Sequence, residues 1–518
     1  MKTQDDLFSL VKRMSPSEKR YFKLNANQQV KGKQNNYVSL FDALDQQKVY
    51  DEKKLLQKLK PQLSQQKFAS IKNYLYHAIL KSLNAYNAGD TISFQIQNEI
   101  RSIHTLLKKD QLKKAIKHCQ KARQMAWTYE KFELLLELLV IYDKLIPGLL
   151  KKKEVLEARM KNHEEKTRVL EIIQNREAYR LLIHQVFDQA KSIYIVRSKE
   201  DIESIQAILA HPILQDIDQC QSFTARFYFL RIQVACYYSL GKYKKQLKSC
   251  KAQFELFQEH PSMIDEYLLS YVKVLFNLVH TAIKIKDTEL AQNHLKLLNQ
   301  IPSTYAARMS FFLRSHLFET SCLLKMQLYA AEANYSGILK MVPEVEQNVQ
   351  TYKAILESDF LAEIWLSIAK SYFHCHLYED ALKFTSYIMD IEKSHLSLGI
   401  FCHARLLRLM VYWEQRDWES MVSSIRTTTR FLQKHDRLFQ PEKLMLKTFS
   451  KLVKSKSRAE SAQIFREFEG LLDGVLISGH EKKFLELLNI RRWVKEQYTR
   501  LKTHSSQNLL KPTSINFS

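Results

Sequence analysis

The stretch AEIWLSIAKSYFHCHLYEDAL, residues 362–382, decides the fold. Trp365, Ala369 and Tyr372 recur in it at intervals that place them on one face of a helix. After a short turn, the small residue Ala381 belongs to a second helix and leaves room for a large side chain opposite. The spacing therefore predicts two antiparallel helices, with Trp365 packed beside Ala369 and Ala381.

This pattern resembles the tetratricopeptide repeat, a helix pair of about 34 residues. The resemblance implies an α-solenoid, in which large residues of each first helix pack on a small residue of the second. The best match contains Trp365, Ile368, Ala369, Tyr372, Tyr378 and Ala381. Weaker matches contain Leu230, Val234, Tyr237, Gly241 and Tyr243, then Leu275, Leu278, Ala282 and Ala291, and then Leu409, Tyr412 and Trp418. In two of these units Gln246 and Met421 replace the small residue, so the helix pairing is better supported than the repeat itself.

The spacing of these matches predicts longer units than the standard repeat. The aligned first helices start near residues 227, 272, 362 and 402, and one unaligned pair, at about 305–345, fills the widest interval. The composition agrees with an all-α fold, because only 9 glycines and 9 prolines occur in 518 residues. A sheet of many strands would need more of both for its tight turns.

Five segments are expected along the chain. Residues 1–90 form an N-terminal helical domain, in which SPSE (15–18) is a capping box that starts a helix near Pro16. The remaining segments are long helical hairpins (91–222), the array of helix pairs (223–440), C-terminal helices (441–502) and a flexible tail (503–518). As a whole, SEKRYFKL followed by this array resembles a group of uncharacterised helical proteins of Bacteroidota, and that resemblance implies no activity.

The charge, the cysteines and the first residues indicate the type of surface and the cellular compartment of the protein. The formal net charge is +24, but the surplus is spread along the chain, which is typical of a solvated helical surface. The seven cysteines show no CxxC spacing, so we expect reduced thiols. The first residues lack the apolar run of a signal peptide, and no stretch has the composition of a membrane span. These features favour a cytoplasmic protein with no membrane partner.

No motif for catalysis or for a cofactor stands out. The phosphate-loop pattern GxxxxGK[ST], GxSxG and HExxH are all absent, and the glycines do not cluster. His374, Cys375 and His376 have the right chemistry for a metal, but consecutive residues of a helix point in diverging directions. We therefore expect neither an enzyme, nor a cofactor, nor a metal centre.

Binding of a partner protein is the function that the pattern favours. A solenoid exposes a concave surface lined by its first helices, and such surfaces hold peptide segments. The expected partner-binding positions combine aromatic and cationic residues, and the cationic ones favour an acidic segment: Tyr228, Arg231, Tyr238, Lys273, Phe276, His280, Lys370, Phe373, His374, His403, Met410 and Trp413. The alternative is that the helices close on each other and bury these aromatic residues. The sequence leaves both open, and it leaves the oligomeric state open.

A second functional class is nucleic-acid binding or regulation through the N-terminal domain. KRYFK (19–23) and YDEKKLLQKLK (50–60) interleave basic and aromatic residues, as a helix that contacts phosphates would. Against this, so small a domain needs Tyr21, Phe22 and Leu24 in its core. We therefore favour a non-enzymatic scaffold for protein binding and keep nucleic-acid binding as the alternative.

Overall fold

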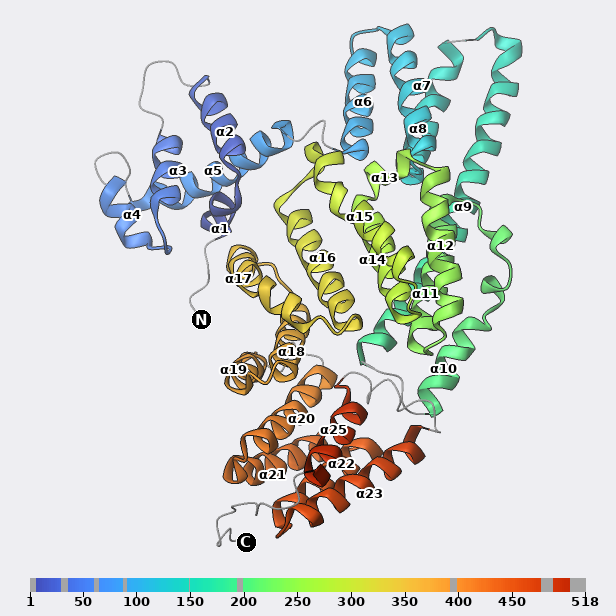
Figure 1. The fold of residues 1–518 in the computed structure, drawn as a ribbon. Helices are drawn as coiled ribbons and strands as arrows, with labels where there is room; N and C mark the ends of the chain where they lie inside the picture. Colours follow the sequence, from blue (N-terminus) through green and yellow to red (C-terminus); the bar gives the residue numbers. More distant parts are fainter. Residues whose placement is uncertain are drawn as a thin grey trace. The chain divides into compact units, whose positions relative to one another are not determined.

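Every regular element that the structure describes is a helix (Figure 1). The computed structural model describes residues 6–28, 36–59, 65–86, 91–148, 150–192, 199–391, 398–476 and 488–503. The predicted all-α fold is confirmed: antiparallel helix pairs form a solenoid, and a small helical domain precedes them. The chain divides into two compact units, Met1–Glu171 and Ile172–Ser518. The finer boundaries at 90, 222 and 440 stay predictions, and the predicted tail lies outside the described residues apart from Thr503.

The N-terminal domain has a hydrophobic core of its own. Its helices are α1 (Asp6–Arg13), α2 (Pro16–Gln28), α3 (Asn36–Gln46), α4 (Glu52–Leu59) and α5 (Gln65–Tyr86). The predicted capping box is confirmed at the start of α2: the Ser15 amide donates to Glu18 Oε2 at 2.7 Å, and the Glu18 amide donates to Ser15 Oγ at 3.3 Å. Phe22 is buried in this core, as predicted, whereas Tyr21 is half-buried outside the core cluster, with its ring 5.1 Å from that of Tyr86.

The prediction that Leu24 belongs to this core is wrong. Its side chain is 55% exposed, whereas Phe22 is 2% exposed. Two positions along an α-helix correspond to a rotation of about 200°, so the face that buries Phe22 turns Leu24 toward solvent.

The rest of the first unit consists of longer helices. They are α6 (Ile92–Leu107), α7 (Leu112–Thr128), α8 (Phe132–Leu145), the 3₁₀ turn η1 (Ile146–Gly148) and the start of α9 (Lys152–Ser192). The chain reverses at Asp110, which lies between α6 and α7 with φ of 55°. The stretch after Gly148 contains neither glycine nor proline up to residue 192. It forms one helix of 41 residues, and the boundary between the two units falls within it.

The second unit is built from successive antiparallel pairs. The pairs are α11 (Phe223–Ser239) with α12 (Tyr243–Glu259), α14 (Leu268–Lys284) with α15 (Thr288–Thr304), α16 (Phe311–Ala331) with α17 (Tyr335–Tyr352), α18 (Ser358–His374) with α19 (Tyr378–Met389), α20 (Leu398–Gln415) with α21 (Trp418–Lys434), and α22 (Gln440–Lys454) with α23 (Arg458–Leu476). The other elements are α10 (Lys199–Leu209), η2 (Pro212–Leu214), η3 (Ile217–Gln219), α13 (Ser262–Glu266), η4 (Ala306–Arg308) and α25 (Ile490–Thr503). The four aligned starts lie in α11, α14, α18 and α20, and the unaligned pair is α16 with α17.

One type of turn joins the two helices in the first five of these pairs. A single residue with positive φ ends the first helix: Gly241, Lys286, Ala333, His376 and Arg416. The next amide then donates back to a carbonyl five residues earlier, as in the bond from the Leu377 amide to the Tyr372 carbonyl at 2.9 Å. This is the Schellman arrangement, which satisfies two of the carbonyls left over at a helix end. It reverses the chain within two or three residues.

In three of these turns, one residue also starts the following helix. Asp287, Asn334 and Asp417 each donate their amide to the first helix and accept, through the side chain, the amide three residues later. These capping bonds are 3.1, 3.0 and 3.0 Å long. A side-chain cap of this kind stabilises a helix by about 1 kcal/mol. The end of one helix and the start of the next are thus fixed together.

The clearest repeat packs as its sequence predicts. Ala369 and Ala381 have no exposed surface, and Trp365 is 8% exposed. The Trp365 ring lies 5.5 Å from the ring of Phe384, which projects from the second helix one turn after Ala381. The small residues therefore allow α18 and α19 to approach closely enough for the aromatic rings to meet.

The C-terminal helix α25 packs on the solenoid through one buried carboxylate. Glu414, near the end of α20, accepts from Trp493 Nε1 at 2.8 Å, from Gln497 Nε2 at 2.5 Å and from Arg500 Nη1 at 2.9 Å. Trp413 Nε1 donates to Gln497 Oε1 at 3.0 Å. These bonds connect residues more than 75 positions apart, because the chain returns to α20 only after α21, α22 and α23.

All seven cysteines are free thiols, and six of them are buried. Burial raises the pKa of Cys119 to about 11 and that of Cys236 to about 12. Cys375, at the end of α18, is the half-buried exception. Within the described ranges, no helix has the length and unbroken apolar composition needed to cross a bilayer.

We expect Ala381→Leu to reduce the free energy of unfolding by about 1–3 kcal/mol, because the added atoms overpack the contact between α18 and α19. Denaturant unfolding followed by circular dichroism measures this change. Lys383→Leu, at an exposed position of the same helix, is the matched control and should change stability by no more than about 0.5 kcal/mol. Equal midpoints for both variants would contradict the packing described for this pair.

Candidate functional site

The first helices of successive pairs share a surface that carries charged side chains. We call this surface the inner face, and it consists of Arg231 and Tyr238 of α11, Lys273 and Lys284 of α14, and Glu363 and Lys370 of α18. Residues of different helices influence each other across it. The charge of Glu363 raises the pKa of Tyr238, and the charge of Arg231 helps to lower the pKa of Lys273, although burial is the largest cause of both shifts.

Glu363 and Lys370 lie two turns apart on α18, on the same side of the helix. Burial raises the pKa of Glu363, and the positive charges of Lys370 and Lys284 oppose that shift. Burial lowers the pKa of Lys370 to about 8, with the charge of Glu363 acting in the opposite direction. Both side chains are nevertheless only half-buried by their accessible surface. A group that water can reach, but that protein surrounds, is typical of a concave surface.

Arg231 and Lys273 show the same combination. Burial lowers the pKa of both, yet Arg231 is half-buried and Lys273 is exposed. The Arg231 guanidinium lies 4.7 Å from the centre of the Phe187 ring, which holds the cation over an aromatic face. The half-buried guanidinium of Arg231 gains more from a carboxylate partner than a fully solvated cation does, because less water must be removed.

An aromatic and amide cluster lies beside these charges. The ring of His280 is 5.7 Å from the rings of both Tyr238 and Phe276, and its Nδ1 is 2.6 Å from Oε1 of Gln327 on α16. This cluster links α11, α14 and α16 side by side. It therefore fixes the distance between the inner-face residues of α11 and those of α14.

The structure divides the predicted partner-binding residues into two groups. Seven keep accessible surface: Tyr228, Arg231, Tyr238, Lys273, Phe276, Lys370 and His374. Five are buried: His280, Phe373, His403, Met410 and Trp413. These five residues are therefore part of the packed core, which is the alternative that the sequence left open. Binding by the seven accessible residues stays a proposal.

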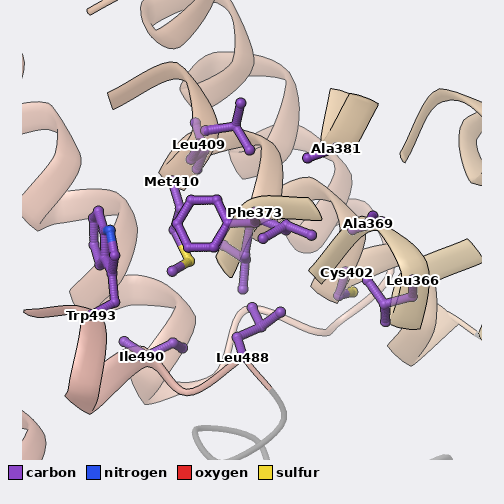
Figure 2. Close-up of a cluster of buried hydrophobic side chains, with 14 of the residues drawn as sticks. Leu366, Ala369, Phe373, Ala381, Cys402, Leu409, Met410, Leu488, Ile490 and Trp493 are labelled. Atoms are coloured by element: carbon purple, nitrogen blue, oxygen red, sulfur yellow. The ribbon is translucent and has the colours of Figure 1, made fainter. Parts of the chain in front are cut away.

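The return of α25 explains most of this burial. Trp413 bonds to Gln497 of that helix, and its ring lies 5.3 Å from the ring of Phe465 on α23. Figure 2 shows Phe373 and Met410 in the same hydrophobic cluster as Trp493 of α25. The surface that α18 and α20 would expose in an open solenoid is thus used to hold the C-terminal helix.

The three residues His374, Cys375 and His376 have different surroundings. The His374 ring stacks at 4.2 Å on Tyr335, and burial, followed by the charge of Lys370, lowers its pKa to about 4. His376 forms the positive-φ turn, with its Nδ1 2.9 Å from the hydroxyl of Tyr378. In the described parts of the chain, no three His, Cys, Asp or Glu side chains group closely enough to hold a metal ion.

Sequence reasoning missed Glu363 and Lys284. Glu363 lies seven residues before Lys370, and this interval places two residues on one face of a helix, so the pair could have been found. Lys284 is the last residue of α14, and its charge acts on Glu363 of α18. The sequence does not show that these two residues lie close together.

We expect Lys370 to titrate near pH 8 and Glu363→Gln to lower its pKa further, because the Glu363 charge is what favours the protonated amine. The pKa can be followed by NMR on ¹³C-dimethylated lysines, with Lys370→Arg to assign the signal. Glu357→Gln is the control: this charge favours protonation of Lys273, so its removal should lower the pKa of Lys273 and leave that of Lys370 unchanged. An ordinary lysine pKa at position 370 would contradict the desolvation of the inner face.

Comparison with solved structures finds similarity at low sequence identity, as three examples show. No protein-family model matches it, and no curated protein matches its sequence. The apo form of RapI is 14% identical, with a TM-score of 0.41 over 79% of this chain and 99% of that chain. A Rap protein complexed with competence and sporulation factor is 11% identical, with a TM-score of 0.41 over 79% and 98%. NprR in complex with its cognate peptide NprX is 13% identical, with a TM-score of 0.39 over 68% and 96%. Similarity at this level carries no information about what this chain binds.

Proposed function

We propose that this protein is a non-enzymatic interaction protein, a scaffold that holds a segment of a partner protein on the inner face. The observation that carries the proposal is the state of the charged residues there. Arg231, Lys273, Glu363 and Lys370 all keep accessible surface, yet protein surrounds them closely enough to shift their pKa values. Charges that already lack much of their hydration bind an oppositely charged segment at a lower desolvation cost.

The partner segment is acidic in this proposal. Arg231 and Lys273 come from neighbouring first helices, and Lys284 adds a third cation at the end of α14. Glu363 is the acidic residue of the face, and the nearby charges of Lys370 and Lys284 oppose the upward shift that burial causes in its pKa. Complementary charge of this kind increases the association rate and selects the partner more than it increases final affinity. Tyr228 and Phe276, both half-buried, supply the apolar contacts.

The cellular setting stays part of the proposal. We infer a cytoplasmic protein, in keeping with its free cysteines. The likeness of the whole chain to helical proteins of Bacteroidota also stays a prediction.

We expect the double variant Arg231→Gln, Lys273→Gln to lose the partner, because it removes two cations of the inner face and leaves the core intact. Affinity purification from the native host, read by mass spectrometry, compares it with the parent. The matched control is Lys244→Gln, Lys248→Gln, which removes two exposed charges from α12. Recovery of the same partners by the parent and by both variants would contradict binding on the inner face. Truncating Phe373 or Trp413 is unsuitable, since loss of a buried aromatic side chain costs about 3–5 kcal/mol of stability.

Nucleic-acid binding by the N-terminal domain is the second candidate. A surface cavity of about 360 Å³ lies beside Lys19, Arg20 and Lys23 of α2, the basic residues of KRYFK. Two of these charges are already paired: Lys19 Nζ is 2.6 Å from Asp45 Oδ1, and Lys23 Nζ is 2.5 Å from Asp42 Oδ1. This pairing reduces the cationic field that a phosphate backbone would meet, so we rank the candidate second.

Salt dependence tests this second candidate. If the domain binds DNA or RNA, affinity should fall by about 10³-fold or more between 50 and 200 mM salt, since bound counterions are released. Filter binding with the full chain measures this. We expect no retention even at the lowest salt, and retention that disappears as salt increases would reverse the ranking of the two functions.

A further inference from the structure

A cavity of about 640 Å³ opens between α19, α20 and α21, in the later part of the solenoid. It is separate from the inner face, because none of the six inner-face residues lines it. Two arginines of α20, Arg405 and Arg408, project into it from adjacent turns of the helix. A row of hydroxyl side chains faces them from α21. None of these arginines and hydroxyl residues belongs to a motif that the sequence shows.

Arg405 is held in place by aromatic rings. Its guanidinium lies 4.9 Å from the ring centre of Phe401 and 4.6 Å from that of Phe431. Its Nε atom is buried and has no hydrogen-bond partner among the described residues. A buried donor without a partner is destabilising, so a ligand that accepts from this guanidinium would recover stabilisation.

Arg408 is oriented by hydroxyl groups. One terminal nitrogen donates to Ser386 Oγ at 3.0 Å, and the other donates to the Tyr412 hydroxyl at 2.7 Å. Neutral hydroxyls fix the direction of the guanidinium but leave its charge uncompensated. The two cations lie three positions apart on one helix, where like charges repel each other.

Two carboxylates also line the cavity, but neither neutralises these cations. Asp390 and Glu419 are both exposed, and neither approaches Arg405 or Arg408 within ion-pair distance in the described structure. Exposed carboxylates remain hydrated and interact with other charges through a high effective dielectric constant. The positive charge at the two arginines is therefore available to an anion that enters the cavity.

The hydroxyl row on α21 supplies further donors. Ser420, Ser423 and Ser424 line the cavity at positions that share one face of the helix. Their hydroxyl groups have no hydrogen-bond partner among the described residues, although the backbone amide of Ser420 is capped by Asp417. Serine in the interior of a helix is less favourable than alanine. Three such residues on one face of a cavity with two arginines form a complete set of donors for an oxyanion.

We propose that this cavity binds a small organic phosphate, with the phosphoryl group between the two arginines and the serines of α21. A phosphoryl group has three strongly accepting oxygens and pairs well with guanidinium forks. The volume lies within the range of small-molecule sites, about 300–1,000 Å³. The aromatic ring of Phe401 and the side chain of Met389, both in the lining, provide an apolar contact for the organic part.

Isothermal titration of the full chain with phenyl phosphate tests the proposal. We expect one molecule bound per chain, at least tenfold more tightly than inorganic phosphate. Ser423→Glu should weaken binding at least tenfold, since Ser423 is exposed and the new carboxylate occupies the anion position without disturbing the core. Ser423→Ala should weaken binding less than Ser423→Glu does, because it removes one hydrogen bond to the phosphoryl group without adding a repelling charge. Arg408→Gln should abolish binding while the helical circular dichroism is retained.

Two controls separate this site from the rest of the surface. Arg466→Gln removes an exposed arginine of α23, and Arg231→Gln, Lys273→Gln removes the charges of the inner face. Both should bind phenyl phosphate as the parent does. Absence of binding at millimolar phenyl phosphate, or equal affinity of the parent and Ser423→Glu, would overturn the site. If phenylacetate binds as tightly as phenyl phosphate, the site does not select a phosphoryl group. If inorganic phosphate binds as tightly, the site does not contact the organic part of the ligand.

Discussion

A single left-handed residue between two helices is the constraint on which the solenoid depends. Because that residue takes a positive φ, the next amide can reach back to the first helix, and the chain reverses within one short turn. The second helix must then lie antiparallel to the first and close to it. The row of first helices, and with it the inner face, follows from repeating this geometry along the chain.

Residues of very different types occupy the positive-φ position of these turns, which is unusual because glycine is normally preferred there. Only Gly241 is a glycine, whereas Lys286, Ala333, His376 and Arg416 carry side chains in the left-handed region. That conformation costs an L-residue about 1–2 kcal/mol. Two backbone hydrogen bonds in each turn, and a side-chain cap after three of them, offset the cost. The scarcity of glycine in the sequence is therefore compatible with many tight turns between helices.

These properties determine how much of the structure the sequence could predict. The helix pairs were predictable, because the large and small residues around Trp365 and Ala381 reflect local packing. The capping box at Ser15 was predictable for the same reason. The burial of Phe373, Met410 and Trp413 was not, since it depends on a helix that returns from far along the chain. The arginine cavity was also hidden, because its residues come from three helices and form no linear motif.

The half-buried thiol of Cys375 gives the molecule a natural attachment point. The other six cysteines are buried, so a maleimide dye under native conditions should react at this position before it reaches them. Burial raises the pKa of Cys375 as well, and mildly alkaline buffer will therefore speed the reaction. The residue follows directly on His374 and lies at the end of the helix that carries Lys370. A fluorophore placed there offers a way to follow the partner segment that we propose for the inner face, without any engineered cysteine.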